Sequence, residues 1–192
     1  MQEEDSLKDR LVRIFYFLPK FYINPIQQVK FAPKRDWLDI LLIQGIVALM
    51  SGIANGLLHG HYVYLFWGIF IFPIVAIGLS FVFALIVHYG ILIFFQQSFP
   101  IRRTYHLVVL ANLPFLLIRV ASPIFPSLDV LGFLMAGFLL SVGMIEDYRL
   151  PKEKVIKLMA ALIGIVLLSW LIQQGYEIMR SPQSFDVKDI AP

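Results

Sequence analysis

The stretch YVYLFWGIFIFPIVAIGLSFVFALIVHYGILIFF, from Tyr62 to Phe95, contains no Asp, Glu, Lys or Arg in 34 residues. A bilayer core of about 30 Å is crossed by roughly 20 apolar residues. The stretch is too long for one upright crossing or an ordinary soluble helix, and it marks an integral membrane protein. Because proline removes a backbone donor and kinks a helix, Pro73 predicts that the stretch divides into two helical parts. We expect a full crossing after Pro73 and an oblique interfacial segment before it.

The composition agrees with a chain that forms one membrane domain. Hydrophobic residues make up 59% of the 192 residues, and the mean hydropathy is +0.77. The polar segments before Trp37 and after Gly175 are too short to suggest a second domain. Cysteine is absent, which excludes disulfides, thiolate metal sites and cysteine catalysis. The opening MQEEDSLKDR lacks the basic and apolar regions typical of a cleaved signal peptide.

Hydropathy predicts an all-α fold, a polytopic helical bundle of five transmembrane helices. Before it, residues 1–36 form an N-terminal segment with an interfacial amphipathic helix, and after it residues 176–192 form a short tail. The expected membrane domain is 37–175, with spans at 37–58, 65–95, 104–121, 128–145 and 155–175.

The charges of the loops predict the orientation of the bundle. Lys and Arg occur before the first span and in the second and fourth loops, whereas the first loop, around His59 and His61, has neither. By the positive-inside rule the basic segments are cytoplasmic, and five spans then place the C-terminal tail outside. The aromatic residues expected at the inner boundary are Trp37, Tyr105 and Tyr148.

The N-terminal segment contains an amphipathic pattern from Leu7 to Leu18, which we expect Pro19 to end. Ser6 and Asp9 have the spacing of a capping box ahead of it. We interpret it as an interfacial helix on the cytoplasmic face; in the alternative, its apolar side packs on the bundle instead of entering lipid. Ile23, Asn24 and Pro25 predict a turn. The basic residues expected to contact lipid headgroups, including two in the second loop, are Lys8, Arg10, Arg13, Arg102 and Arg103.

Small residues recur at the end of the first span, in GIANGLLHG. This spacing places Gly52, Gly56 and Gly60 on one helical face, where backbones can approach closely. The face fits packing inside the bundle or a homodimer contact.

Polar side chains within the spans are the candidates for chemistry, because a charge in hydrocarbon costs at least a few kcal/mol. The candidate polar or transport site consists of Asp39, His88, Asn112, Glu146 and Asp147. With the predicted orientation, its ionisable members lie toward the cytoplasmic ends of their spans. They fit an ion-paired seam with Arg102, Arg103 and Arg149, a transport or proton-relay site, or a cation site. We expect Arg119 and Asp129, which flank the third loop, to pair with each other or with lipid phosphate.

Motifs for metal binding and catalysis are weak. Imidazole and carboxylate ligands suit zinc, manganese or iron, so His88, His106 and Glu146 are metal candidates on ligand type alone. No EXXH or HEXXH spacing supports them, and whether a metal binds stays unknown. The chain also lacks a GxSxG elbow, a Walker loop and a dinucleotide fingerprint. We therefore expect no enzymatic activity and no cofactor, and the net charge of +3 is explained by topology without nucleic acid.

Several features of layout resemble the Yip1-domain family of small membrane proteins, especially its bacterial and archaeal branch. They include the INP turn before a Trp-led first span, the exit of the second span from Gly90 to Phe95, and the basic pair Arg102 and Arg103. The third span then contains ANLPFLL with Pro114. It is followed by a proline-containing third loop and by a basic loop before the last span. The resemblance covers about Phe21 to Gln174. It implies five spans with a cytoplasmic N-terminus. The long N-terminal region and DLYGP-type motif of eukaryotic members, which are linked to small GTPases, are missing.

Together these features predict a non-enzymatic protein of the cytoplasmic (inner) membrane of a prokaryote that organises membrane or partner proteins. Its expected partners are membrane lipids, with a homo-oligomer or other membrane proteins also open. The alternative is a small transporter or channel that uses the candidate polar site.

Overall fold

The computed structural model describes residues 6–31, 35–122, 124–125 and 128–180, and their regular structure is entirely helical. Five helical segments are long and apolar enough to cross a membrane, which confirms the predicted bundle. They are Trp37–Leu58, Tyr62–Phe95, Ile101–Ala121, Leu128–Glu146 and Lys152–Ile172. The last predicted span continues as a helix to Arg180, and the tail at 181–192 lies outside the described residues.

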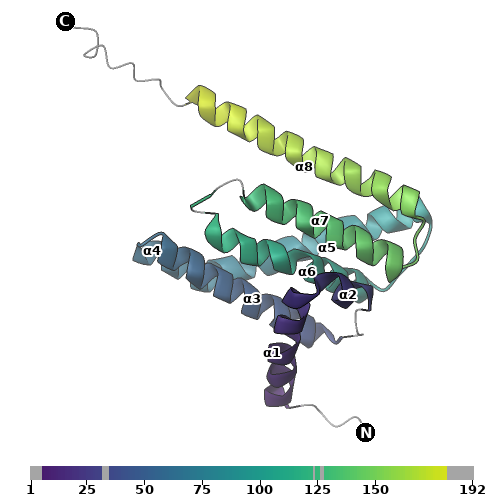
Figure 1. The fold of residues 1–192 in the computed structure, drawn as a ribbon, viewed down its shortest axis with the longest axis horizontal. Coiled ribbons are helices and arrows are strands. Elements are labelled where there is room, and N and C mark those ends of the chain that lie inside the picture. Colours follow the sequence, from purple (N-terminus) through teal and green to yellow (C-terminus); the bar gives the residue numbers. More distant parts are fainter. Residues whose placement is uncertain (1–5, 32–34, 123, 126–127, 181–192) are drawn as a thin grey trace, which may run out of the picture.

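The helices follow one another along the chain, as Figure 1 shows. The elements are α1 (Leu7–Ile23), α2 (Pro25–Lys30), α3 (Trp37–Leu58), α4 (Tyr62–Phe66), the π-helix η1 (Trp67–Ile71), α5 (Phe72–Phe95), α6 (Ile101–Ile118), the 3₁₀-helix η2 (Arg119–Ala121), α7 (Leu128–Glu146) and α8 (Lys152–Arg180). We call the end where α3 and α6 begin the basic end, because Arg102, Arg103 and Arg149 lie there. The opposite end, where α3 leads to His59, is the His59 end.

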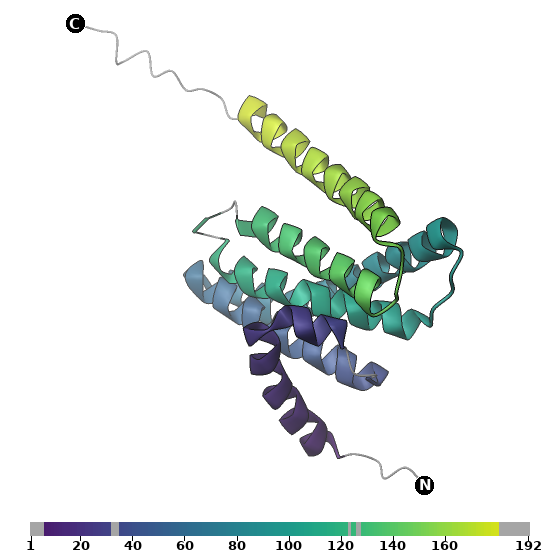
Figure 2. The same ribbon diagram turned by 45° about the vertical axis from the view of Figure 1, so that its right-hand side comes forward.

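The centre of the bundle is α6, which packs against α3, α5 and α7. In its span, 61% of the residues in the most apolar window are buried, compared with 11% for Tyr62–Phe95 and 11% for α8. The high buried share of α6 reflects an unbroken run of buried residues from Thr104 to Ala111. In Figures 1 and 2, α8 lies beside α7 on the periphery and diverges from it toward its C-terminal end. The apolar surfaces of α5 and α8 are therefore available to lipid.

The amphipathic helix α1 extends beyond the predicted end at Pro19. The missing N–H of Pro19 costs one helical bond, but burial of Leu18 and Phe21 on either side holds the helix together. The Asn24 N–H then bonds the carbonyl of Lys20 at 3.2 Å, so the expected turn begins at Asn24. The predicted start is confirmed, because the Asp9 N–H donates to Ser6 Oγ at 3.3 Å.

The apolar residues of α1 divide between the bundle and the exterior. Ile14, Phe17, Leu18 and Phe21 are buried, so the alternative in which α1 packs on the bundle holds for this side. A second set is exposed, namely Leu7, Val12, Phe15 and Tyr16. Figures 1 and 2 show α1 leaving the bundle obliquely. The helix is thus docked along one side and free to meet lipid on another.

Around Pro73, the second span departs from a simple kink. The break takes the form of η1, a π-helical turn immediately before α5, with Pro73 in the first turn of α5. A π-turn accommodates a residue that cannot donate to the preceding helical turn. α4 and η1 pack along the end of α3, and the expected oblique interfacial position of residues 65–72 stays a prediction.

Candidate functional site

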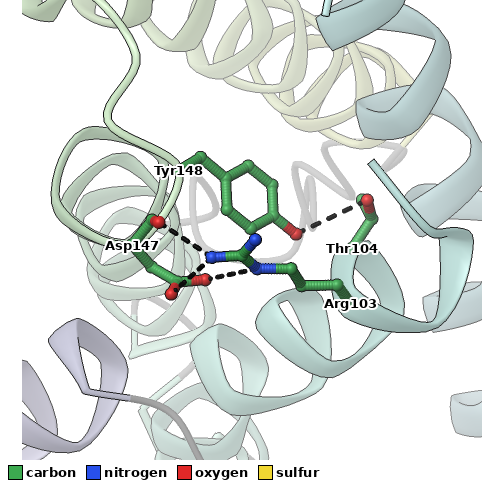
Figure 3. A network of polar contacts seen from close by, with 4 residues as sticks. All are labelled: Arg103, Thr104, Asp147 and Tyr148. Carbon is green, nitrogen blue, oxygen red and sulfur yellow. Dashed lines mark hydrogen bonds and ion pairs between the residues drawn. The ribbon is translucent and has the colours of Figure 1, made fainter. Parts of the chain in front are cut away.

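At the basic end, one network joins α6 to the segment that follows α7 (Figure 3). Arg103 donates to both carboxylate oxygens of Asp147, with Nη2 2.8 Å from Oδ1 and Nε 3.0 Å from Oδ2. The same Nη2 donates to the backbone carbonyl of Asp147 at 2.8 Å. A fork of this kind is the strongest form of ion pair, because it fixes geometry as well as charge.

Aromatic rings support the guanidinium of this network. The Arg103 Cζ lies 4.8 Å from the centroid of the Tyr148 ring and 5.5 Å from that of Phe99, and those two rings are stacked. The Tyr148 hydroxyl lies 3.5 Å from Thr104 Oγ1. Burial raises the pKa of Tyr148, so its phenol stays neutral and is not a base at ordinary pH.

Two further ion pairs attach the N-terminal helices to the bundle. Arg10 of α1 donates to Asp39 of α3 at 2.9 Å, and both side chains are largely buried. Lys30 of α2 lies 3.3 Å from Glu146 at the end of α7. Asp36 adds a looser contact with Arg10 and with Arg102, each at 3.8 Å.

Members of the candidate polar site therefore have separate partners. Asp39, Glu146 and Asp147 each pair with a base from a different element. His88 on α5 stacks edge-on against its neighbour Tyr89, and Asn112 on α6 donates to Ser80 at 3.4 Å. A cavity of about 540 Å³ at the basic end is lined by Glu146 and Asp147, but not by Asp39, His88 or Asn112.

Asn112 belongs instead to a buried network near the middle of the bundle. Gln44 of α3, 1% exposed, donates to the carbonyl of Ala76 at 3.0 Å and to Ser80 Oγ at 2.7 Å. It accepts a hydrogen bond of 2.6 Å from the Tyr105 hydroxyl. Tyr105, which is expected at the inner membrane boundary, is fully buried near the start of α6, and its hydroxyl has this partner inside the bundle. This network was not predicted from the sequence. The feature that could have indicated it is the presence of a polar residue in each of three apolar spans, namely Gln44, Ser80 and Asn112.

The metal candidates do not form a coordination site. In the part of the chain that the structure describes, no group of three or more His, Asp or Glu side chains is placed to hold a metal ion. His106 is buried, and its Nε2 has no hydrogen-bond partner. The electrostatic neighbours of its ring are Arg35 and Asp147.

The five basic residues that are expected to contact lipid headgroups differ in their contacts within the chain. Arg10 and Arg103 bind carboxylates of the chain itself, and Arg102 lies 3.8 Å from Asp36. Lys8 and Arg13 are exposed on α1, and Arg102 is about half exposed. Contact of these five residues with lipid headgroups stays a prediction.

The predicted glycine face packs inside the chain along most of its length. A Cβ at Gly52 would fall on the carbonyl oxygen of Gly68 in η1, and a Cβ at Gly56 would lie 2.7 Å from Leu65 Cα. Gly60 does not extend this face; it has φ +67° and no atom within 4 Å of its would-be Cβ. Its role is the left-handed turn after α3.

At the His59 end, the expected Arg119–Asp129 ion pair is not formed. The Arg119 Cζ lies 5.0 Å from the centroid of the Phe72 ring and 6.0 Å from that of Phe115. Among the described residues, no carboxylate oxygen lies within ion-pair distance of it. Asp129 Oδ1 is buried with no hydrogen-bond partner.

Comparison of the chain with protein-family models, with curated proteins and with solved structures finds no match.

Proposed function

We propose that the chain is a non-enzymatic integral membrane protein of the Yip1 type that organises membrane or partner proteins. Its basic end, with the N-terminal segment, would face the cytoplasm of a prokaryotic cell. The bundle would serve as an anchor, and α1 would act on the cytoplasmic surface of the membrane. The family assignment is supported by the sequence motifs alone.

The observation that supports this function best is how the ion pairs are used. Arg10–Asp39 joins α1 to α3, and Lys30–Glu146 joins α2 to α7. Two carboxylates that a transporter would need for a moving cation, Asp39 and Glu146, are thus engaged in holding the N-terminal helices α1 and α2 against the bundle. Such pairing favours a scaffold over a transport pathway.

The exposed side of α1 indicates how the protein would act on a membrane. Phe15 is 60% exposed and Tyr16 70% exposed, while Ile14 and Phe17, their neighbours in sequence, are buried. Apolar side chains presented this way enter the headgroup region and bind according to their buried area. A helix inserted from one leaflet while fixed to a membrane anchor would bend or order that leaflet.

The test is reconstitution of the purified chain into phospholipid vesicles, with vesicle shape recorded by electron microscopy. We expect the chain to reduce vesicle diameter, and F15S/Y16S to lose this effect because its α1 stays docked without the inserting side chains. The matched control is L131S on α7, which removes an apolar side chain about 50% exposed from a different helix. Equal vesicle shapes with the chain and with F15S/Y16S would contradict the proposal.

A small transporter is the second candidate, because Glu146 and Asp147 line the cavity at the basic end. The same vesicles test it, with a pH-sensitive dye or a cation indicator trapped inside. The scaffold function predicts no flux above that of protein-free vesicles. A flux that E146Q abolishes would support the transporter instead.

A further inference from the structure

Arg119 occupies an unusual position in the half of the bundle toward the His59 end. Its guanidinium lies over aromatic rings and, among the described residues, has no carboxylate within ion-pair distance. A charge at this depth is costly unless an anion or water meets it. The described part of the chain thus holds a five-donor cation for which it supplies no carboxylate counter-ion.

Two hollows open on either side of this guanidinium. One, of about 230 Å³, lies between α3, the α4–η1 segment and α5, and its polar lining includes Asn55, Tyr64 and Trp67. The other, of about 280 Å³, runs between α5, α6 and α7 past Leu79 and Phe83. Arg119, Phe72 and Val75 line both of them. Arg119 thus stands where the two hollows meet, and the second hollow is lined mainly by apolar side chains, with Ser80 and Asn112 as its other polar residues.

Backbone contacts fix the position of the elements that line the first hollow. Gly52 of α3 and Gly68 of η1 touch through their backbones, so the π-turn is held against α3 at a fixed place. The Asn55 amide donates to the Arg119 carbonyl at 3.3 Å, which fixes the residue that carries the guanidinium. Tyr64 and Trp67, both more than half exposed, add a hydroxyl and an indole N–H at the rim.

We propose that this is a binding site for one phospholipid of the leaflet at the His59 end. Arg119 binds the phosphodiester, because its planar fork matches two phosphate oxygens. Tyr64 and Trp67 lie at headgroup level, as expected for the aromatic belt of a membrane protein. One acyl chain lies in the second hollow, along the apolar part of its wall that Leu79 and Phe83 form. The site is independent of the proposed function and of the orientation of the chain.

The test uses the fluorescence of Trp67 in the full-length chain with W37F and W170F, so that the reporter lines the site itself. Phosphatidylglycerol with a brominated acyl chain quenches this fluorescence on contact. We expect it to quench at about one-tenth the mole fraction that brominated diacylglycerol requires, since a charged hydrogen bond to phosphate is worth about a tenfold change in affinity. Glycerol phosphate in solution, which lacks the chains, should not relieve the quenching.

Two variants locate the effect. R119Q keeps an amide of similar reach but removes the charge, and V75F keeps the charge, adds no second tryptophan and fills the hollow. In both, the two brominated lipids should quench alike, while R149Q, which removes an exposed guanidinium at the basic end, should keep the tenfold difference. Equal quenching in the unmutated background, or a preference unchanged in folded R119Q or V75F, would overturn the proposal. Relief of quenching by glycerol phosphate would show that a free phosphate ester is the ligand, and would equally overturn it.

Discussion

Gln44 joins three helices at one point. Its side chain satisfies Ser80 and Ala76 on α5 and Tyr105 on α6. We expect Q44L to lower the free energy of unfolding by about 1–2 kcal/mol, because it leaves a buried hydroxyl without a partner inside the bundle. The measurement is the equilibrium unfolding of the purified chain in mixed detergent.

A double-mutant cycle separates the bond from the packing. Y105F in the Q44L background removes the orphaned hydroxyl, so the double variant should be more stable than the sum of the two single changes. S141A is the matched control, because Ser141 bonds only the carbonyl of Gly137 in its own helix and should change stability by less than about 0.5 kcal/mol. Strict additivity of Q44L and Y105F would show that the bond is not made.

For individual residues, the sequence identifies the polar side chains of the spans but not their partners. Asp39, Glu146 and Asp147 share one end of the bundle, as hydropathy predicted, yet each meets a base that no local spacing points to. Arg10 is 29 positions from Asp39, and Arg103 is 44 from Asp147. Such pairs depend on how the helices rotate about their axes, and that rotation follows from packing of the whole bundle.

Among the elements, the hairpin that α3 forms with α4 and η1 depends on two glycines at its contact. Gly52 of α3 and Gly68 of η1 have no side chains, so their backbones can touch. G52A should prevent the π-turn from reaching α3, because the added Cβ would overlap the Gly68 carbonyl. G45A is the control on the same helix, where a Cβ meets no atom within 4 Å. We expect G52A to lower the thermal midpoint strongly, and G45A to leave it unchanged or raise it, since alanine favours helix by up to about 1 kcal/mol. Similar midpoints would contradict the contact.

The docking of α1 can be tested on the helix itself. Phe21 is fully buried, whereas Phe15 is 60% exposed on the same helix. F21A should release α1, because removing a buried phenylalanine costs about 3–5 kcal/mol, and F15A should not. Release is measured as faster trypsin cleavage at Lys8, Arg13 or Lys20 of the detergent-solubilised chain. Equal cleavage rates in F21A and F15A would show that Phe21 does not hold the helix.

For the whole molecule, hydropathy predicted the number of spans. The differences in hydropathy between the spans also indicate which span lies at the centre of the bundle. The most buried span, Ile101–Ala121, has the lowest mean hydropathy, 1.5, while the exposed Tyr62–Phe95 and Lys152–Ile172 have 2.8 and 2.5. A central helix can carry polar groups because its neighbours satisfy them, whereas a lipid-facing helix cannot. The ranking predicts which span is central. It does not predict the π-turn or the separation of α8 from α7, which depend on individual contacts.

The orientation of the whole bundle in the membrane is directly measurable, because the chain contains no cysteine. H61C and S98C place single thiols on exposed positions at opposite ends of the helix that crosses between them. With the basic end in the cytoplasm, a membrane-impermeant maleimide should label H61C in intact cells and S98C only after the membrane is opened. The unmutated chain gives the background. The positive-inside rule acts through Arg102 and Arg103 beside Ser98, so the reverse pattern would mean that these charges do not set the topology.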